Sequence, residues 1–505
     1  MKFNINLRRK APVLNYEGEK AFALTPEMEL YTAVVTTSLS NKFYEGSLER
    51  LERIRVLISI CDPAFVARLA IYAREVLNLR SIPLVLAVEL ARLHQGDRLV
   101  SRLTNRVVQR ADEITEMLAL YGQANKRSGR KQLNRLSKQV QGGLATAFNK
   151  FDEYQFAKYN RSAQVTLKDA LFLVHPKAKD EDQQAIFNKI AEDGLNSPYT
   201  WEVELSALGQ LRYVNDAVRK AAFCEKWEEL IFSKRLGYMA TLRNLRNILE
   251  ANVSVEAIDQ VCEYLTDPGA IAKSRQLPFR FLSAYRELKA VPHGQAGKVL
   301  EALEKAVQFS TANIAGYDEA TNVLIAADVS GSMQKTISSH SKVQNFDIGL
   351  MLAMLLQYRC ANVITGMFGD TWKVINLPRK QILANVDEFH RREGEVGYST
   401  NGFLVVKDLL QRKKMVDKLM IFTDCQLWNP DNSTDNIANL WLQYKRVSPH
   451  AKLYLFDLAG YGNTPLKVQH NDVYLIAGWS EKIFDVLNAI DQGSDALKLI
   501  GSIEL

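Results

Sequence analysis

The stretch NVLIAADVSGSM, residues 322–333, decides the fold of the second part of this chain. Its first six residues are an apolar run typical of a buried strand, and the run ends at Asp328. Asp328, Ser330 and Ser332 follow at every second position, so a carboxylate and two hydroxyls can converge on one point. Such oxygen ligands suit a hard cation such as Mg²⁺, and the motif holds no histidine or thiolate to favour zinc. The serines could instead cap the next helix, but a carboxylate ending a buried strand is costly without a counter-charge.

Apolar strands and helices alternate from about residue 317 onward. Further apolar runs occur at 363–368, 373–377, 418–423, 452–458 and 473–477, with helical segments at 346–358, 403–412, 437–444 and 481–490. This alternation predicts a mostly parallel sheet covered on both faces, in which ligands bind at the carboxyl ends of the strands. Thr400, in a loop just before a helix, and Asp424, directly after an apolar strand, lie at such positions. With the first motif they form the pattern of a metal-ion-dependent adhesion site in a von Willebrand factor A domain, a Rossmann-like α/β fold.

Residues 25–310 are instead a succession of amphipathic helices. Thr25-Pro26 and Asp62-Pro63 each place a capping side chain before a proline at the first helical position. Helical spacing of apolar residues recurs at 81–93, 112–121, 133–148, 203–211, 238–249, 255–265 and 277–288. Helices of this length with short links predict stacked helical pairs, an α-solenoid, although an irregular helical domain is also compatible with the pattern. We therefore expect two domains, residues 1–316 and 317–505.

The formal net charge of +7 is unevenly distributed. Residues 321–505 hold 19 basic and 19 acidic side chains, so the whole surplus lies in the first 320 residues. This asymmetry favours a polyanionic partner for the helical part alone. The five scattered cysteines form no CxxC pair, which is typical of thiols in a reducing cytoplasm. No stretch approaches the ~20 apolar residues that cross a bilayer, and the first residues lack a signal peptide's apolar core. We expect a cytoplasmic protein with no membrane partner.

A basic segment lies within the helical part, because no acidic residue occurs between Met117 and Phe151. The candidate RNA-binding side chains here and in the following residues are Arg127, Arg130, Lys131, Lys150, Lys158, Arg161, Lys168 and His175. Tyr154 and Tyr159 place aromatic rings among these cations. Phosphates need Lys and Arg, and exposed bases need rings to stack on, so the segment predicts an RNA surface. A charge run can also be a solvated face, and the tyrosines can be half-buried core residues.

Both parts of the chain together resemble the Ro autoantigen and its bacterial relatives, the TROVE family. A helical-repeat module followed by a von Willebrand A domain is the layout of that family. The stretches that carry the resemblance are Phe43-Tyr44-Glu45, Leu51-Glu52-Arg53-Ile54-Arg55, Leu242-Arg243-Asn244-Leu245-Arg246-Asn247, Pro278-Phe279-Arg280 and Ala326–Met333. One departure is Tyr398-Ser399-Thr400-Asn401, where relatives usually have Gly-Gly-Thr-Asp. The threonine remains, so the ligand set is kept.

The resemblance implies a HEAT-like helical solenoid that is closed into a ring by the A domain. Family members bind small non-coding Y RNAs on the outer basic surface and single-stranded 3′ ends of misfolded RNA in the central hole, and bacterial members work with exoribonucleases. Residues 168–177 resemble a family stretch whose histidine and neighbouring cations face RNA. His175 is therefore expected to contact RNA, with Lys150, Lys158, Arg161 and Lys168 as companions. A helix-terminal capping histidine is the alternative.

Two other functions are open. The A domain could capture an acidic protein partner, because adhesion sites of this kind leave one coordination position for an outside carboxylate. An enzyme has less support, since the chain has no P-loop, GxSxG or HExxH motif and no general base poised over a nucleophile. We expect a non-catalytic RNA-binding protein that holds a divalent cation.

Overall fold

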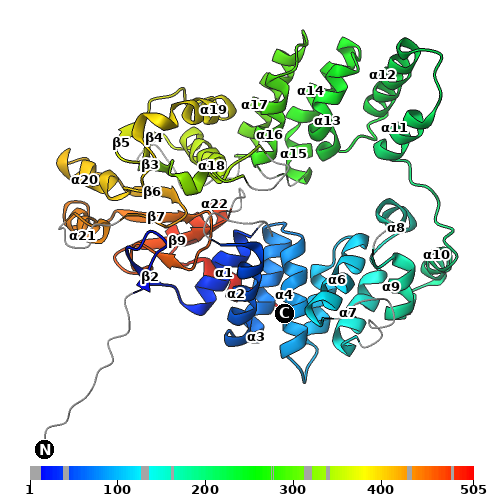
Figure 1. Ribbon diagram of the computed structural model, residues 1–505, viewed down its shortest axis with the longest axis horizontal. Helices are drawn as coiled ribbons and strands as arrows, with labels where there is room; N and C mark the ends of the chain where they lie inside the picture. Colours follow the sequence, from blue (N-terminus) through cyan, green and yellow to red (C-terminus); the bar gives the residue numbers. More distant parts are fainter. Residues whose placement is uncertain are drawn as a thin grey trace, which may run out of the picture. The chain divides into compact units, whose positions relative to one another are not determined.

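The computed structural model describes residues 13–37, 45–126, 136–160, 164–274, 276, 278–311, 321–336, 342–428, 435–478 and 483–505. The chain forms two compact units, each made of two separate stretches of sequence, which the colours of Figure 1 identify by residue number. Met1–Arg50 and Ile314–Trp479 make the sheet unit, and Leu51–Asn313 and Ser480–Leu505 make the helical unit. In the part of the chain described, no helix combines the length and apolar character needed to span a membrane.

These units differ from the predicted domains 1–316 and 317–505 at both ends of the chain. Strand β2 (Lys20–Ala23) pairs antiparallel with β8 (Asn463–Thr464), and the Tyr31 hydroxyl lies 3.3 Å from the carbonyl oxygen of Ala477, so the N-terminal segment belongs with the sheet. Helix α23 (Ala496–Gly501) packs against α3 (Pro63–Ile71), so the C-terminal segment belongs with the helices. Sequence order alone hides these long-range contacts.

The sheet unit is built on a six-stranded sheet, ordered β5-β4-β3-β6-β7-β9. Its strands are β3 (Asn322–Asp328), β4 (Asn362–Phe368), β5 (Trp372–Val374), β6 (Lys418–Thr423), β7 (Lys452–Asp457) and β9 (Val473–Ala477). All neighbouring pairs are parallel except β4 and β5. The inner strands are buried almost throughout, because helices cover both faces, as expected for apolar runs without alternation.

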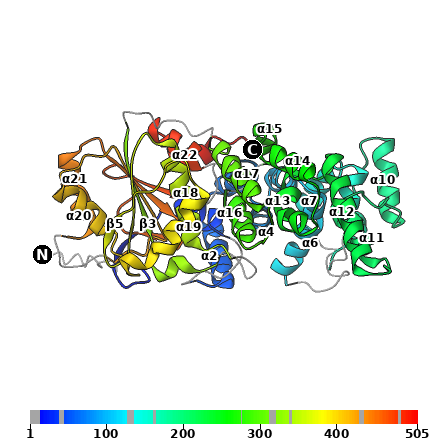
Figure 2. The ribbon, with the colours of Figure 1, turned by 90° about the horizontal axis from the view of Figure 1, so that it is seen from above.

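Helices lie on either side of this sheet (Figure 2). They are α1 (Pro26–Val35), α18 (Asn345–Arg359), α19 (Leu383–Arg392), α20 (Phe403–Gln411) and α21 (Ile437–Val447), with short turns η3 (Gly331–Gln334) and η4 (Glu393–Val396). Helix α18 packs on β3, β4 and β6 and is buried along nearly its whole length. A second, three-stranded sheet joins β1 (Val13–Leu14), β2 and β8. The hairpin of β1 and β2 was not anticipated from the sequence.

The helical unit consists of successive helices joined by short links. They are α2 (Ser47–Ile60), which begins in the sheet unit, α3, η1 (Tyr72–Val76), α4 (Ser81–Leu93), α5 (Leu99–Val107), α6 (Ala111–Ala124), α7 (Lys138–Phe148), α8 (Glu153–Tyr159), α9 (Leu167–Val174), α10 (Glu181–Ala191), α11 (Trp201–Gln210), α12 (Asp216–Phe232), α13 (Tyr238–Glu250), α14 (Val255–Thr266), α15 (Pro268–Ser274), α16 (Pro278–Lys289), α17 (Ala296–Phe309), α22 (Ile483–Asp491) and α23. The predicted caps are found, because Thr25 accepts from the Met28 amide and Asp62 from the Phe65 amide.

Neighbouring helices bury their apolar faces on one another, as expected of stacked pairs. Helices α3, α4, α5 and α7 pack in succession, and so do α12, α14 and α17, with α13 and α16 beside them. Figure 1 shows the second group side by side. The predicted helix 133–148 is shorter, since α7 begins at Lys138, and residues 133–135 lie outside the described part of the chain.

Candidate metal centre and nucleic-acid interface

The first candidate site lies at the carboxyl edge of the six-stranded sheet. Asp328 is the last residue of β3, and Asp424 follows the last residue of β6. Strands β3 and β6 are parallel neighbours with Ala327 opposite Phe422, so the two carboxylates emerge at the same edge. Both are buried, with 1% of their surface exposed.

The two serines of the motif turn back toward Asp328. The Ser330 amide donates a 2.9 Å hydrogen bond to Asp328 Oδ1, and the Ser330 and Ser332 hydroxyl oxygens are 3.2 Å apart. Ser330 precedes the short turn η3, and Ser332 lies within it. In the described part of the chain neither serine caps a helix through its side chain, so the capping alternative has no support.

Thr400 reaches the same place from the loop before α20. Its hydroxyl accepts a 2.8 Å hydrogen bond from the Trp428 amide and is buried beside the serines. A cavity of about 530 Å³ is lined by Ser330, Ser332, Thr400, Asn401, Trp428 and Glu17, among others. We call it the cation pocket. The structure thus brings Ser330, Ser332 and Thr400 into one pocket. Asp328 and Asp424 do not line that pocket, but each is hydrogen-bonded to one of its serines, Asp328 to Ser330 and Asp424 to Ser332.

The two buried carboxylates are the strongest indication that this site binds a cation. Burial, then the nearby charge of Asp328, raises the pKa of Asp424 to about 7, and burial raises the pKa of Asp328 to about 6. Asp424 Oδ1 accepts from the Gln426 amide at 3.0 Å, but Oδ2 is buried without a hydrogen-bond partner among the described residues. A buried carboxylate oxygen of this kind needs a donor or a cation. The donors present are carboxylate and hydroxyl oxygens, which fit a hard divalent cation.

The second candidate site is the basic segment of the helical unit. Four of its predicted RNA-binding residues, Arg127, Arg130, Lys131 and Arg161, lie outside the described residues. The other four, Lys150, Lys158, Lys168 and His175, are described and differ in their surroundings.

Lys150 is engaged with the protein itself. Its ammonium donates to the carbonyl oxygens of Asn105 and, at 3.0 Å, Val108, where α5 ends. Burial of the ammonium lowers its pKa to about 8, although the residue as a whole is exposed. An ammonium that already donates to two backbone carbonyls has fewer donors left for a phosphate than an ammonium without such bonds.

Lys158 lies among aromatic rings. Its ammonium is 5.7 Å from the ring centre of Tyr154 and 5.8 Å from that of Tyr159, within the range of cation–π attraction. The ring of Tyr159 also contacts Arg110, whose guanidinium carbon lies 4.2 Å from the ring centre. Tyr154 is 47% exposed, so its ring is open to a ligand and is not a core residue.

Lys168 and His175 stand at opposite ends of α9. Lys168 forms a 2.6 Å ion pair with Asp193 near the surface, a contact that water and salt weaken. His175 is the C-cap of α9, with a left-handed φ of 51°, and is exposed. The capping position predicted as the alternative is therefore found, and the exposed imidazole is still available to a ligand.

A second group of rings and cations faces Tyr154 and Lys158. Tyr199, Trp201 and Arg235 line the same cavity of about 290 Å³. The guanidinium of Arg235 lies 4.6 Å over the ring of Tyr199. We call this cavity the aromatic–cationic pocket, defined by Tyr154, Lys158, Tyr199, Trp201 and Arg235. Sequence reasoning missed its second half, because Tyr199 and Arg235 lie in different links.

A comparison with protein families matches the TROVE domain to residues 32–196 and 192–300, more than half of the chain. The chain belongs to the TROVE family. Proteins of this family are known as RNA-binding proteins. The family resemblance of the sequence is thereby confirmed, and Lys150, Lys158, Lys168 and His175 all fall within the first matched range.

Two curated TROVE relatives are telomerase protein component 1 of Rattus norvegicus and of Mus musculus. The rat protein is 25% identical over 305 residues, 45% of this chain, and the mouse protein is 25% identical over 313 residues, 46% of this chain. The chain spans only 11% of the length of either relative.

A solved TROVE structure shows the fold. The crystal structure of the Deinococcus radiodurans RO (RSR) protein matches 91% of this chain and 99% of that chain, with a TM-score of 0.58 and 18% identity. The predicted fold class, a helical-repeat domain with an α/β domain, is confirmed by this likeness.

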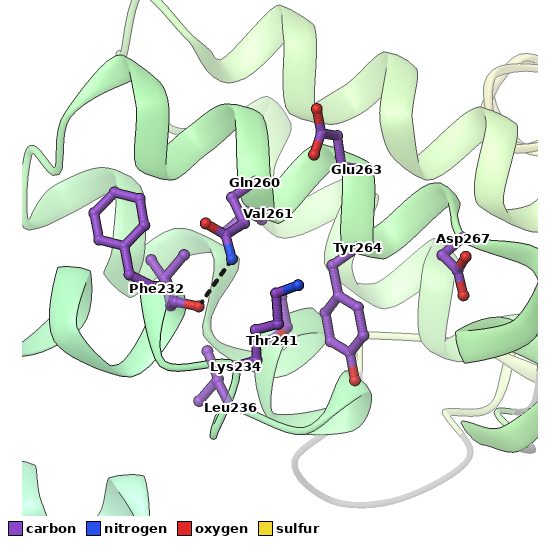
Figure 3. Close-up of a pocket in the computed structure, with 10 residues that line it drawn as sticks. Phe232, Lys234, Leu236, Thr241, Gln260, Val261, Glu263, Tyr264 and Asp267 are labelled. Atoms are coloured by element: carbon purple, nitrogen blue, oxygen red, sulfur yellow. Dashed lines mark hydrogen bonds between the residues drawn. The ribbon is translucent and has the colours of Figure 1, made fainter.

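The TROVE helical unit holds one larger cavity, of about 710 Å³, that the sequence did not suggest. Figure 3 shows the Gln260 amide bonded to the backbone carbonyl of Ile231, 3.3 Å away, and the amine of Lys234 between that amide and the ring of Tyr264. Glu263 and Asp267 also line the cavity. These two carboxylates offset the single amine, so the cavity suits an RNA phosphate less well than the aromatic–cationic pocket does.

Proposed function

We propose that this TROVE protein is a non-catalytic RNA-binding protein. Its ligands are a small non-coding, Y-like RNA and the single-stranded 3′ ends of misfolded RNA, and it scaffolds RNA quality control or decay by an exoribonuclease. The observation that carries the RNA-binding proposal is the aromatic–cationic pocket, together with the positive charge of the first 320 residues. The finer choice of RNA and nuclease rests on the family.

The pocket has the two elements that single-stranded RNA requires. Tyr154, Tyr199 and Trp201 offer ring faces on which an unpaired base can stack. Lys158 and Arg235 lie beside those rings and can contact the phosphates that flank the base. A base-paired helix has no free ring face to insert, so the pocket favours unpaired nucleotides.

The test is fluorescence anisotropy with a labelled stem-loop that carries a single-stranded tail. We expect Tyr154→Ala to weaken binding by about 1–3 kcal/mol, the contribution of one stacked base, whereas the matched Tyr154→Phe keeps the ring and the affinity. Binding should also weaken steeply with salt. Equal affinities of the two variants would remove the pocket from the RNA site.

We also propose that the cation pocket holds Mg²⁺ or another divalent ion, with Asp328, Ser330, Ser332, Thr400 and Asp424 as its ligands. Bound there, the ion supplies a positive charge with a coordination position for an anionic oxygen. The two buried carboxylates and the bare Oδ2 of Asp424 support this proposal. Calorimetric titration with Mg²⁺ tests it. We expect binding by the wild-type protein and none by Asp424→Ala.

A second function, capture of an acidic protein partner, is favoured because the cation pocket is lined in part by the solvent-exposed residues Glu17, Tyr398 and Ser399. The Asp328→Ala variant separates the two functions. Loss of a protein partner with RNA affinity unchanged would support partner capture, and equal loss of RNA affinity would show that the site serves the fold.

A further inference from the structure

The hairpin of β1 and β2 brings an acidic residue to the cation pocket. Glu17 lies in the turn between the two strands and lines the pocket together with Ser330, Ser332 and Thr400. No basic side chain lines this pocket within the described part of the chain. The carboxylate of Glu17 therefore shares one small space with the hydroxyls of Ser330, Ser332 and Thr400.

The hairpin turn has a defined shape. The Asn15 side-chain oxygen accepts from the amides of Glu17, at 3.0 Å, and Glu19, at 2.9 Å. Gly18 takes a φ of +80°, which a residue with a side chain rarely adopts, and its amide donates to the Asn15 carbonyl at 3.0 Å. This turn holds Glu17 at the tip of the hairpin.

The hairpin is anchored to the residues that follow the metal ligand Asp424. The Tyr16 amide donates to Gln426 Oε1 at 2.8 Å, and the Asn15 amide group donates to the Leu427 carbonyl at 2.9 Å. The Gln426 amide in turn donates to Asp424 Oδ1. One residue, Gln426, thus positions both the carboxylate of Asp424 and the tip of the hairpin.

We propose that Glu17 is an intramolecular ligand of the cation pocket, which occupies the coordination position that an outside carboxylate would otherwise take. This inference rests on the proposed cation site. Mg²⁺ prefers six oxygen ligands, and the strand edge supplies two carboxylates and three hydroxyls. A third carboxylate at the open side completes such a set. An acidic partner must then displace the hairpin tip, so the hairpin regulates access to the ion.

The test uses Mn²⁺ as the probe, because its bound waters can be counted by magnetic resonance. We expect Glu17→Gln to weaken Mn²⁺ binding by at least roughly tenfold, since removal of even an outer-shell partner has an effect of this size. In Glu17→Ala, the bound Mn²⁺ should hold one more water than in the wild type, and it should bind added acetate more tightly. Glu19→Gln, in the same turn but not lining the pocket, is the matched control and should leave all three quantities unchanged.

The outcomes separate the two proposals. If the wild-type protein binds no Mn²⁺, the cation site itself is wrong. If the wild type binds Mn²⁺ and both Glu17 variants match it in affinity, water count and acetate binding, Glu17 is no ligand while the cation site stands.

Discussion

Thr423 Oγ1 donates a 2.6 Å hydrogen bond to Asp328 Oδ2, across the two central strands of the sheet. Both residues are buried. Asp328 Oδ1 accepts a hydrogen bond from the Ser330 amide, so both oxygens of this carboxylate are hydrogen-bonded. The two bonds together fix the orientation of the carboxylate beside the cation pocket. A residue outside the predicted ligand set therefore positions one of the predicted ligands.

We expect Thr423→Val to lower the free energy of unfolding by about 1–3 kcal/mol, because it leaves a buried acceptor without its donor. Thr365→Val is the matched control. Thr365 Oγ1 is also buried but has no hydrogen-bond partner among the described residues, so valine there should be neutral or stabilising. Urea unfolding of both variants in EDTA measures the difference. Identical midpoints would mean that the bond to Asp328 contributes nothing.

The stability of the metal-free protein should fall as pH rises from about 4 to about 7. Burial raises the pKa of Asp328 and of Asp424, so the folded protein holds these protons more tightly than the unfolded chain does. Their contribution is therefore complete below the ordinary carboxyl pKa and lost as pH passes the raised values. Melting curves in EDTA against curves in excess Mg²⁺ check this, because the ion should remove most of the decline. A decline that is the same in both buffers would contradict the expectation.

The cation pocket could be predicted from sequence because its signals are local. Asp328, Ser330 and Ser332 are adjacent, and the rule that parallel strands end at one edge places Asp424 beside them. No sequence motif predicts that Glu17 lies at this pocket. Glu17 precedes Asp328 by more than three hundred residues, and it reaches the site through the pairing of β2 with β8 and through the hydrogen bonds of Asn15 and Tyr16 to Leu427 and Gln426.

The RNA candidates illustrate a different limit. A sequence shows that Lys150 and Lys158 are charged but not what each ammonium touches. One donates to two backbone carbonyls and the other lies over tyrosine rings. The partners Tyr199 and Arg235 were missed because links between helices carry no periodic pattern from which their positions could be inferred.

We expect joint replacement of Lys168 and His175 by glutamine to weaken RNA binding by about 1–3 kcal/mol, the scale of lost charge-assisted contacts. The ion pair of Lys168 with Asp193 is exposed and should cost little stability when it is lost. Lys467 and His470, exposed residues of the sheet unit, provide a control of the same composition, and their double glutamine variant should bind RNA normally. Anisotropy titrations at one salt concentration compare the two. Equal affinities would exclude α9 from the RNA surface.

Replacement of Lys150 by methionine should reduce stability more than RNA affinity. The variant keeps the stem but leaves the carbonyls of Asn105 and Val108 without this donor, at a cost of about 1–3 kcal/mol. Because burial lowers the pKa of Lys150 to about 8, below the ordinary value of 10.5, the folded protein releases this proton first. Burial of the charged ammonium destabilises the wild type but not the methionine variant. The free energy of unfolding of the wild type should therefore increase relative to that of the variant as pH rises from 8 to 10.5.

The matched change is Lys158→Met, which removes an exposed cation that lies over Tyr154. It should weaken RNA binding while the unfolding midpoint stays close to that of the wild type, since exposed cation–π contacts contribute only about 0.5–1 kcal/mol. Measuring both quantities for both variants separates a helix-end donor from an RNA contact. The opposite result would be that Lys150→Met binds RNA more weakly than Lys158→Met does and is the more stable of the two variants. That result would assign Lys150 to the RNA surface, because a lysine that only binds the carbonyls at a helix end should not contribute to RNA affinity.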